Sequence, residues 1–409
     1  MRYIADLHLH GKYSRATSKN LLLPELEKYA NIKGINLLST ADFTHPKWIE
    51  HLKENLEEDD TGILRTKTDF PFILQTELSL IYSQEGKGRR VHLLLYARNF
   101  EVVEQITEAL LKIGRVDYDG RPIFGISCIE FTELMKAIDK DIEIVPAHIW
   151  TPWFSVFGSK GGFDSLKECF GDQLKHIHAL ETGLSSDPAM NWRLSQLDKY
   201  TLISNSDSHS FWPWRIGREA NVFEYKDLTY DNFLETLKTR KNFKETIEVD
   251  PAYGKYHYDG HRKCNVCLRP SETMKLKGIC PVCKKDLTIG VEYRVEELAD
   301  RPEGYIPDDA IPFRTLMPLS DIISKMKSRA VSTKTVWDEY NKILSKFDNE
   351  MSVLLDATLN DLEKATDPHI AQAIIDVREG KIKVQPGYDG EYGIPIFSKT
   401  DKKEFFKIK

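Results

Sequence analysis

The sequence predicts an α/β fold, in which a barrel of about seven βα units is followed by a small four-cysteine module and a helical C-terminal region. β-rich runs alternate with amphipathic helical stretches up to about residue 248. Four cysteines then fall between residues 264 and 283, and apolar residues recur at three-to-four spacing from about residue 312. We therefore expect domains at residues 1–248, 249–306 and 307–409.

The barrel elements follow one another in chain order. Each expected strand is a short run of β-branched and aromatic residues, and each expected helix is longer with an apolar stripe. The expected strands cover residues 3–6, 36–42, 70–76, 91–97, 142–148, 178–182 and 201–207. The clearest expected helices cover residues 24–34, 48–57, 101–114 and 129–138. Glycines at 380, 387, 390 and 393 predict turns near a short strand in the tail of the last domain.

Composition describes an ordinary globular chain of 409 residues, 41% of them hydrophobic and 29% charged. No apolar stretch approaches the roughly 20 residues that a membrane span needs, and residues 1–10 lack a signal-peptide pattern. We expect a cytoplasmic protein with no membrane partner, and a monomer by default. The net charge of −6 means that any contact with nucleic acid must come from a local basic patch.

Histidines and carboxylates gather where the expected strands end. His8 and His10 lie two residues apart and therefore project from the same face of a strand. Mixed imidazole and carboxylate ligands suit Zn, Mn, Mg or Fe, and the number present can hold two or three divalent ions. The candidate ligands are His8, His10, Asp42, His45, Glu77, His92, His148, Asp207 and His209.

This set of ligands predicts phosphoester hydrolysis. Ions a few Å apart can activate a water and stabilise the leaving oxygen during in-line attack, and Glu77 is the candidate to bridge them. Asp187 is a second catalytic candidate, because it could orient the nucleophile or protonate the leaving group. It could equally cap a helix that begins at Pro188, and Glu181 has the same ambiguity with a weaker case.

At this point the residues resemble a known superfamily. DLHLH, Glu77, PAH and SDSHS resemble the four motifs of the PHP (polymerase and histidinol phosphatase) superfamily over roughly the first 250 residues. The resemblance implies a distorted TIM-like (β/α)7 barrel with a trinuclear metal site. The second motif departs from the adjacent Asp-His of many relatives, since it reads Asp42-Phe-Thr-His45, and which of these two residues binds metal stays open.

A more particular combination spans nearly the whole chain. DFTHPKW, PAHIWTPWFS, ETGLSSDPAMNWR, the four-cysteine module and PGYDGEYG together resemble the endonuclease Q family. The resemblance implies a DNA-repair enzyme that acts on damaged DNA. Such an enzyme cleaves on the 5′ side of deaminated bases (hypoxanthine, uracil, xanthine) and abasic sites, leaving 3′-hydroxyl and 5′-phosphate ends.

The cysteine module predicts a structural zinc ion. Cys264 and Cys267, then Cys280 and Cys283, form two CxxC pairs whose four thiolates would close a tetrahedral site with no open position for catalysis. Lysines on the same module offer a basic face that could hold backbone phosphates, and the alternative is a solvated surface that only caps the barrel. These are Lys275, Lys277, Lys284 and Lys285, with a weaker second patch at Lys325, Lys327 and Arg329.

Aromatic and basic residues follow two of the candidate ligands. Trp150 and Trp153 come after His148, and Trp212 and Trp214 come after His209. Their rings could rim the site and stack on an exposed base, while packing is the alternative for each. Arg215 and Arg218 could clamp a phosphate or pair with nearby acids.

Two other functions fit part of this pattern. A histidinol-phosphatase-like enzyme for small molecules explains the metal site but leaves the C-terminal half without a role, and a nucleic-acid-binding protein with an inactive barrel would require missing ligands. A sliding clamp would be a natural partner of a repair enzyme. The aromatic pair in KKEFF, residues 402–406, does not complete a clamp-binding motif.

Overall fold

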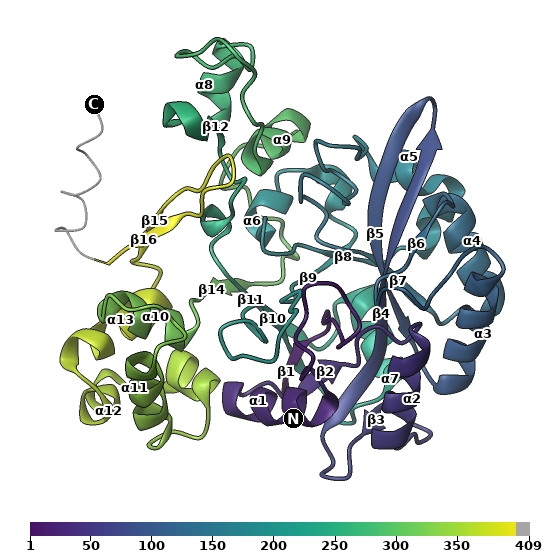
Figure 1. Ribbon diagram of the computed structural model, residues 1–409, viewed down its shortest axis with the longest axis horizontal. Helices are drawn as coiled ribbons and strands as arrows, with labels where there is room; N and C mark the ends of the chain where they lie inside the picture. The colour runs from purple at the N-terminus through teal and green to yellow at the C-terminus, as the bar shows by residue number, and fades with distance from the viewer. Residues whose placement is uncertain (398–409) are drawn as a thin grey trace.

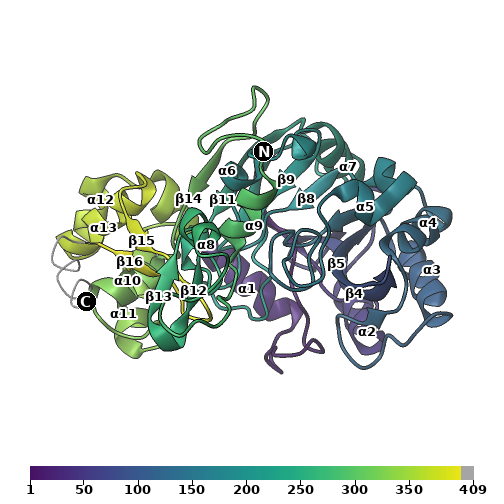
Figure 2. The same cartoon turned by 90° about the horizontal axis from the view of Figure 1, so that it is seen from above.

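The structure is a computed structural model, and it describes residues 1–397. The barrel helices α2 to α5 and the C-terminal helices α10 to α13 lie at opposite ends of the long axis, with the cysteine module between them (Figures 1 and 2). The 402–406 segment lies outside the described residues. Within the described part of the chain, no helix is both long enough and apolar enough to cross a membrane.

Seven of the described strands surround the barrel. Among them β1 pairs with β2, β2 with β4, β4 with β5 and β5 with β7, while β8 pairs with β9 in a separate sheet. Ile149 N–H donates to the Glu181 carbonyl at 3.0 Å and joins the end of β7 to β8, and a bridge between Leu9 and Ser208 closes the ring beside β1. The predicted α/β barrel is confirmed. These strands are β1 Arg2–Asp6, β2 Leu37–Ser39, β4 Pro71–Gln84, β5 Lys87–Ala97, β7 Glu143–Pro146, β8 Ala179–Glu181 and β9 Thr201–Ile203.

One departure from regular βα units is the long antiparallel hairpin of β4 and β5, which projects beyond the barrel (Figure 1). Glu85 and Gly86 form its two-residue turn with φ of 53° and 73°, the left-handed backbone that tight hairpins require. Glu77 and His92 consequently lie within long strands and not at strand ends as the sequence suggested. Short strands β3 (Leu64–Arg65) and β6 (Ile123–Phe124) add to β4.

A second departure lies beyond β1. There the sheet continues into β10 (Ala220–Glu224), β11 (Phe243–Glu248) and β14 (Phe313–Thr315). Strand β14 pairs in parallel with β11 through Thr246 opposite Phe313, so a segment expected among the C-terminal helices joins the barrel sheet.

Helices cover the outside of the barrel, and side-chain caps fix where α3 and α4 begin. Asn99 accepts from Val102 N–H at α3, and Ser127 forms a capping box with Glu130 at α4. The barrel helices are α1 Leu23–Lys33, α2 Pro46–Asn55, α3 Phe100–Leu111, α4 Cys128–Ile138, α5 Leu166–Phe170, α6 Pro188–Asn191 and α7 Tyr230–Thr239. Short 3₁₀ turns lie at Gly171–His176 and Ser195–Leu197.

The remaining elements form the module and the C-terminal helices. The tail folds back on the module, since Tyr388 bridges Tyr258 and Gly387 N–H donates to the Ala252 carbonyl at 2.8 Å. The module holds β12 Asp259–His261, β13 Val266–Leu268, α8 Pro270–Lys275 and α9 Val291–Leu298, with 3₁₀ turns at Pro251–Tyr253 and Arg262–Cys264. The helical region holds α10 Leu319–Met326, α11 Lys334–Leu344, a π-helical turn Ser352–Asp356, α12 Leu359–Ala365, α13 Pro368–Arg378, and the tail strands β15 Lys383–Gln385 and β16 Ile394–Ile396.

Candidate metal centre and nucleic-acid surface

Two groups of imidazoles and carboxylates meet inside the barrel and share Glu77. In each group the ligand atoms lie within 4.8 Å of one another. The first group is His8, His10, Glu77 and Asp207, and the second is Glu77, His92 and His148.

Glu77 divides its two carboxylate oxygens between the groups. Its Oε2 lies 3.1 Å from His10 Nε2 and 3.6 Å from His8 Nε2. Its Oε1 lies 2.7 Å from His92 Nδ1 and 3.1 Å from His148 Nε2. A fully buried carboxylate with one oxygen toward each imidazole pair has the geometry of a bridging ligand, which supports the role proposed for Glu77.

Three candidate ligands stand on strained backbone. Asp42, His148 and Asp207 have φ of 34°, 32° and 47°, a left-handed conformation that residues other than glycine adopt at a cost. Gly183 makes room for one of these turns, because a Cβ there would meet the His148 side chain at 2.5 Å. Such strain accumulates at sites where side-chain direction matters more than local stability.

The donor set fits divalent metal ions. His8 Nε2, Asp42 Oδ1 and His45 Nδ1 are buried without a hydrogen-bond partner, which is costly unless another group binds them. Imidazole nitrogens and carboxylate oxygens in these proportions suit Zn, Mn or Fe, and the residues present do not by themselves select one of them.

Glu181 is a buried carboxylate that orients both His8 and the backbone of His148. Glu181 receives His8 Nδ1 at 3.0 Å and the backbone N–H of His148 at 2.8 Å. Burial alone would lower the pKa of His8, but surrounding carboxylates, Glu181 foremost, reverse this and raise it well above its ordinary value. Glu181 therefore supports the ligands, a role that sequence reasoning did not separate from catalysis.

Three further candidate ligands border the first group. Asp42 Oδ1 lies 3.3 Å from His10 Nδ1, and the rings of His10 and His209 are 4.2 Å apart. His45 stacks on Tyr13 at 4.4 Å with the rings nearly parallel. The structure thus places Asp42 in contact with the first group. His45 lies three residues later in the chain, at the N-cap of α2.

Arg121 is a residue of the centre that sequence reasoning missed. Its Nη1 lies 2.9 Å from Glu77 Oε2, and its side chain is 27% exposed, so it reaches from the mouth of the site to the shared carboxylate. Gly120 lets this segment pass closely, since a Cβ there would meet Asp42 Oδ2 and Ser14 Oγ at 2.2 Å. No sequence motif marks Arg121, because it lies in an irregular segment between α3 and β6.

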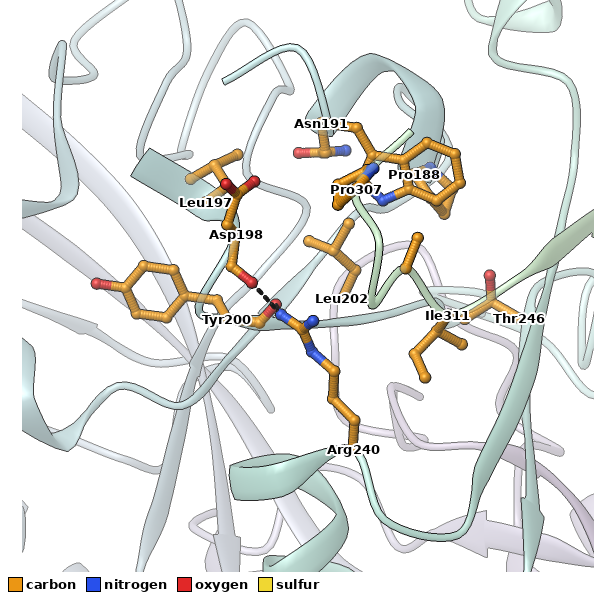
Figure 3. Close-up of a pocket in the computed structure, with 12 residues that line it drawn as sticks. Pro188, Asn191, Leu197, Asp198, Tyr200, Leu202, Arg240, Thr246, Pro307 and Ile311 are labelled. Atoms are coloured by element: carbon orange, nitrogen blue, oxygen red, sulfur yellow. Dashed lines mark hydrogen bonds between the residues drawn. The ribbon is translucent and has the colours of Figure 1, made fainter. Parts of the chain in front are cut away.

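Asp187 caps α6, as one of its two readings predicted. It accepts from Met190 N–H at 2.8 Å, and burial raises the pKa of its carboxyl to about 6. The cavity beside α6 holds about 30 Å³ and is crossed by Arg240, which donates to the carbonyls of Asp198 and Tyr200 (Figure 3). That space admits about two waters and no nucleotide.

The cysteine module presents a different ligand set from the one predicted. His261, Cys264, Cys280 and Cys283 lie together, with His261 Nδ1 at 3.2 Å from the sulfurs of Cys264 and Cys283. Cys267 is exposed and stands outside this group, which corrects the expectation of four thiolates. Backbone N–H groups of Cys283 and Val282 outweigh burial and lower the pKa of Cys280 to about 6, which favours the thiolate that zinc binds.

Comparison with solved structures covers nearly the whole chain. The crystal structure of the lesion-specific endonuclease PfuEndoQ from Pyrococcus furiosus matches with a TM-score of 0.87 and 31% identity, over 97% of this chain and 95% of that one. A structure of endonuclease Q with a 27-mer duplex substrate carrying an abasic lesion at the active site matches with a TM-score of 0.86 and 32% identity, over 98% of each chain. The chain belongs to the endonuclease Q family.

Two curated proteins and one family model also match the chain. Bacillus subtilis YqxK is 30% identical over 95% of this chain and 98% of its own length. MJ0043 of Methanocaldococcus jannaschii is 33% identical over 73% of this chain, and the match spans 37% of that longer protein. The family model described as the MJ0043 C-terminal domain matches residues 318–381. The predicted enzyme class is confirmed at the level of the family, since its solved members are endonucleases.

The residues that the sequence suggested as DNA contacts are partly exposed and partly buried. Lys275, Lys277, Lys284 and Lys285 are all exposed on the module. Trp153 is 40% exposed beside Tyr256. Trp150 is only 1% exposed and donates to Asn191 Oδ1 at 2.8 Å, so it packs in the core and does not rim the site.

A cavity of about 310 Å³ lies between the barrel, the module and the C-terminal helices, and several of the remaining candidates line it; Trp212 does not line it and packs against Tyr29 and Trp214. Trp214, Arg215 and Arg218 line it together with Tyr253 and Asp321. Arg218 also donates to the Ser206 carbonyl at 2.9 Å, next to the candidate ligand Asp207. This volume lies within the range of small-molecule pockets, about 300–1,000 Å³.

Proposed function

We propose that the chain is a DNA repair endonuclease that hydrolyses the phosphodiester bond 5′ to deaminated bases and abasic sites, leaving 3′-hydroxyl and 5′-phosphate ends. The observation that carries the proposal is the pair of ligand groups sharing Glu77, in a chain that matches a lesion-specific endonuclease along nearly its whole length. A relative held with an abasic duplex supports damaged DNA as the partner. Within the same proposal, residues 1–248, 249–306 and 307–409 form catalytic, zinc-binding and helical domains.

The residues that would hold two or three divalent ions are those of the two groups, with Asp42, His45 and His209 beside them. When bound, such ions supply an activated water and stabilise charge on the scissile phosphate. Glu77 keeps the two groups at a fixed spacing. His8 and His10 are held in one orientation by Glu181 and Asp42, so the site needs little rearrangement to bind its ions.

Two further residues have roles in the proposed chemistry. Arg121 carries a fixed positive charge at the mouth, where it can hold a phosphate oxygen. Asp187 caps α6, and burial raises the pKa of its carboxyl to about 6; we assign it the role of proton donor to the leaving oxygen. In this scheme Glu77 and Asp187 are the catalytic carboxylates, as the sequence suggested.

The cavity lined by Trp214, Arg215 and Arg218 is the proposed pocket for a base extruded from the helix. An aromatic plane and two guanidinium groups suit the carbonyl-bearing rings of hypoxanthine and uracil, which accept hydrogen bonds where adenine and cytosine donate them. The lysines of the module would bind phosphates of the DNA backbone away from this pocket.

The test is cleavage of end-labelled duplexes that carry one deoxyinosine, one deoxyuridine, one abasic site or no lesion, with Mn²⁺ or Mg²⁺ present. We expect a single cut 5′ to the lesion that is lost in His8→Ala and Asp207→Ala. Absence of cutting together with rapid phosphate release from small monoesters would instead establish a phosphatase of the histidinol-phosphatase type.

A further inference from the structure

The segment that carries two candidate ligands is a closed loop, residues 206–218, which we call the ligand loop. Asp6 fastens both ends, because Oδ1 accepts from Ser206 N–H at 3.0 Å and Oδ2 accepts from Gly217 N–H at 2.8 Å. Asp207 and His209 follow directly after the first end. The base of the loop is therefore fixed by the barrel itself.

The tip of the ligand loop is held from a different direction. The Lys33 ammonium donates to the Pro213 carbonyl at 2.8 Å and to Glu350 Oε1 at 2.6 Å. Lys33 ends α1 of the barrel, whereas Glu350 belongs to the C-terminal helices. The two side chains are 1% and 0% exposed. The tip of the loop is therefore bonded to a buried ion pair that joins the barrel to the C-terminal helices.

Glu350 is itself fixed by the helices around it. Its Oε1 also accepts from Leu319 N–H at 2.9 Å, and its Oε2 accepts from the Tyr340 hydroxyl at 2.7 Å. Besides Lys33, the two donors to this carboxylate come from α10 and α11, so its position depends on how these helices pack. A displacement of these helices would therefore reach Pro213 through Lys33.

Aromatic rings reinforce the same contact. Trp212 and Trp214 stack at 5.1 Å with nearly parallel rings, and Trp337 of α11 lies 5.9 and 5.3 Å from them. Tyr29 of α1 approaches Trp212 at 5.3 Å. The tip of the loop is thus clamped between the first barrel helix and the C-terminal helices.

We propose that Lys33 and Glu350 are positioning residues for the metal centre: through Pro213 they couple docking of the C-terminal helices to the placement of Asp207 and His209. A buried ion pair is a poor source of stability compared with apolar packing of the same volume. The pair instead fixes the position of the loop tip, because one ammonium donates both to the Pro213 carbonyl and to Glu350 on a separate element. The inference rests on the proposed function only where cleavage is the readout.

The test uses a double substitution, Lys33→Met with Glu350→Gln. It removes both charges of the ion pair together, and the glutamine side chain can still form hydrogen bonds with Leu319 and Tyr340, so folding should survive. Pro213 loses its donor. The control is Arg314→Met with Glu245→Gln, which removes a more exposed ion pair between the C-terminal region and the barrel, with nitrogen and oxygen also 2.6 Å apart.

Binding of Mn²⁺ alone is followed by electron paramagnetic resonance of the free ion, and cleavage of an abasic duplex is measured in parallel. We expect Mn²⁺ affinity in the double variant to fall at least tenfold and kcat to fall with it, while the control stays within threefold of the unaltered protein. Trp337→Leu, which loosens the tip without touching any charge, should shift Mn²⁺ affinity in the same direction.

Unchanged Mn²⁺ affinity in the folded double variant, or an equal loss in the control, would overturn the proposal. Failure of the unaltered protein to cut DNA would overturn the proposed function instead. The two failures are distinguishable because Mn²⁺ binding does not depend on which ester is the substrate.

Discussion

Replacing His261 with alanine should release zinc from the cysteine module, whereas replacing Cys267 should not. His261 Nδ1 lies 3.2 Å from two cysteine sulfurs, and Cys267 stands exposed outside the group. Structural zinc in small modules is bound with about 10–16 kcal/mol. An equal share for each of four ligands is about 2.5–4 kcal/mol, so His261→Ala should weaken zinc binding by about two to three orders of magnitude.

Zinc affinity can be measured by competition with a chromogenic chelator, with Cys280→Ser as a positive control that must also release zinc. Substituting Co²⁺ gives a second reading, because sulfur-to-cobalt charge-transfer absorption scales with the number of thiolates and should correspond to three. The reasoning is refuted if Cys267→Ala loses zinc as readily as Cys280→Ser while His261→Ala keeps it. Four thiolates would then bind the ion, as the CxxC spacing alone suggested.

Three further predictions concern the barrel and the DNA surface. Glu77→Gln should remove both ions of the shared groups at once and lower cleavage at least about a thousandfold, whereas His92→Ala should remove one; metal content per chain, measured by mass spectrometry, distinguishes them. Burial raises the pKa of Glu248 to about 8. The protonated carboxyl therefore contributes fully to the free energy of unfolding below its unfolded pKa, about 4.3, and this contribution is lost as the pH rises toward 8. Glu248→Gln should therefore raise the melting temperature more at pH 8.5 than at pH 5, and an equal gain at both would contradict this. Replacing Lys275, Lys277, Lys284 and Lys285 with alanine should weaken DNA binding and flatten its salt dependence by about 0.9 in log–log slope for each phosphate that the variant no longer neutralises, which fluorescence anisotropy at several salt concentrations would measure; an unchanged slope would remove the module from the DNA surface.

Much of the barrel was predictable because its information is local. His8 and His10 share a face through the two-residue period of extended chain, and the other ligand motifs adjoin short apolar runs that are typical of buried strands. The hairpin of β4 and β5 was missed although Glu85-Gly86 is a turn signal, because the βα rhythm on either side outweighed it. Strand β14 was missed because three residues pair with β11 only through tertiary contact.

The residue types of the site were predictable from the sequence, but the orientation of several side chains was not. Sequence adjacency placed Trp150 near His148 but could not tell that its ring points into the core. CxxC spacing identified a metal module but could not tell that His261 faces the ion position and Cys267 faces solvent. Arg121 reaches Glu77 from an irregular segment 44 residues away, a distance that no local pattern encodes.

Strand β14 also bears on how this chain can be divided. Its parallel pairing covers residues 246–248 of β11, so a barrel cut off after residue 248 would carry a bare strand edge with unpaired backbone N–H and carbonyl groups. Such an edge recruits strands from other molecules. A shortened chain that clumps and shows no activity would then report the loss of a protective border, and would say nothing about whether the remaining residues can perform the chemistry.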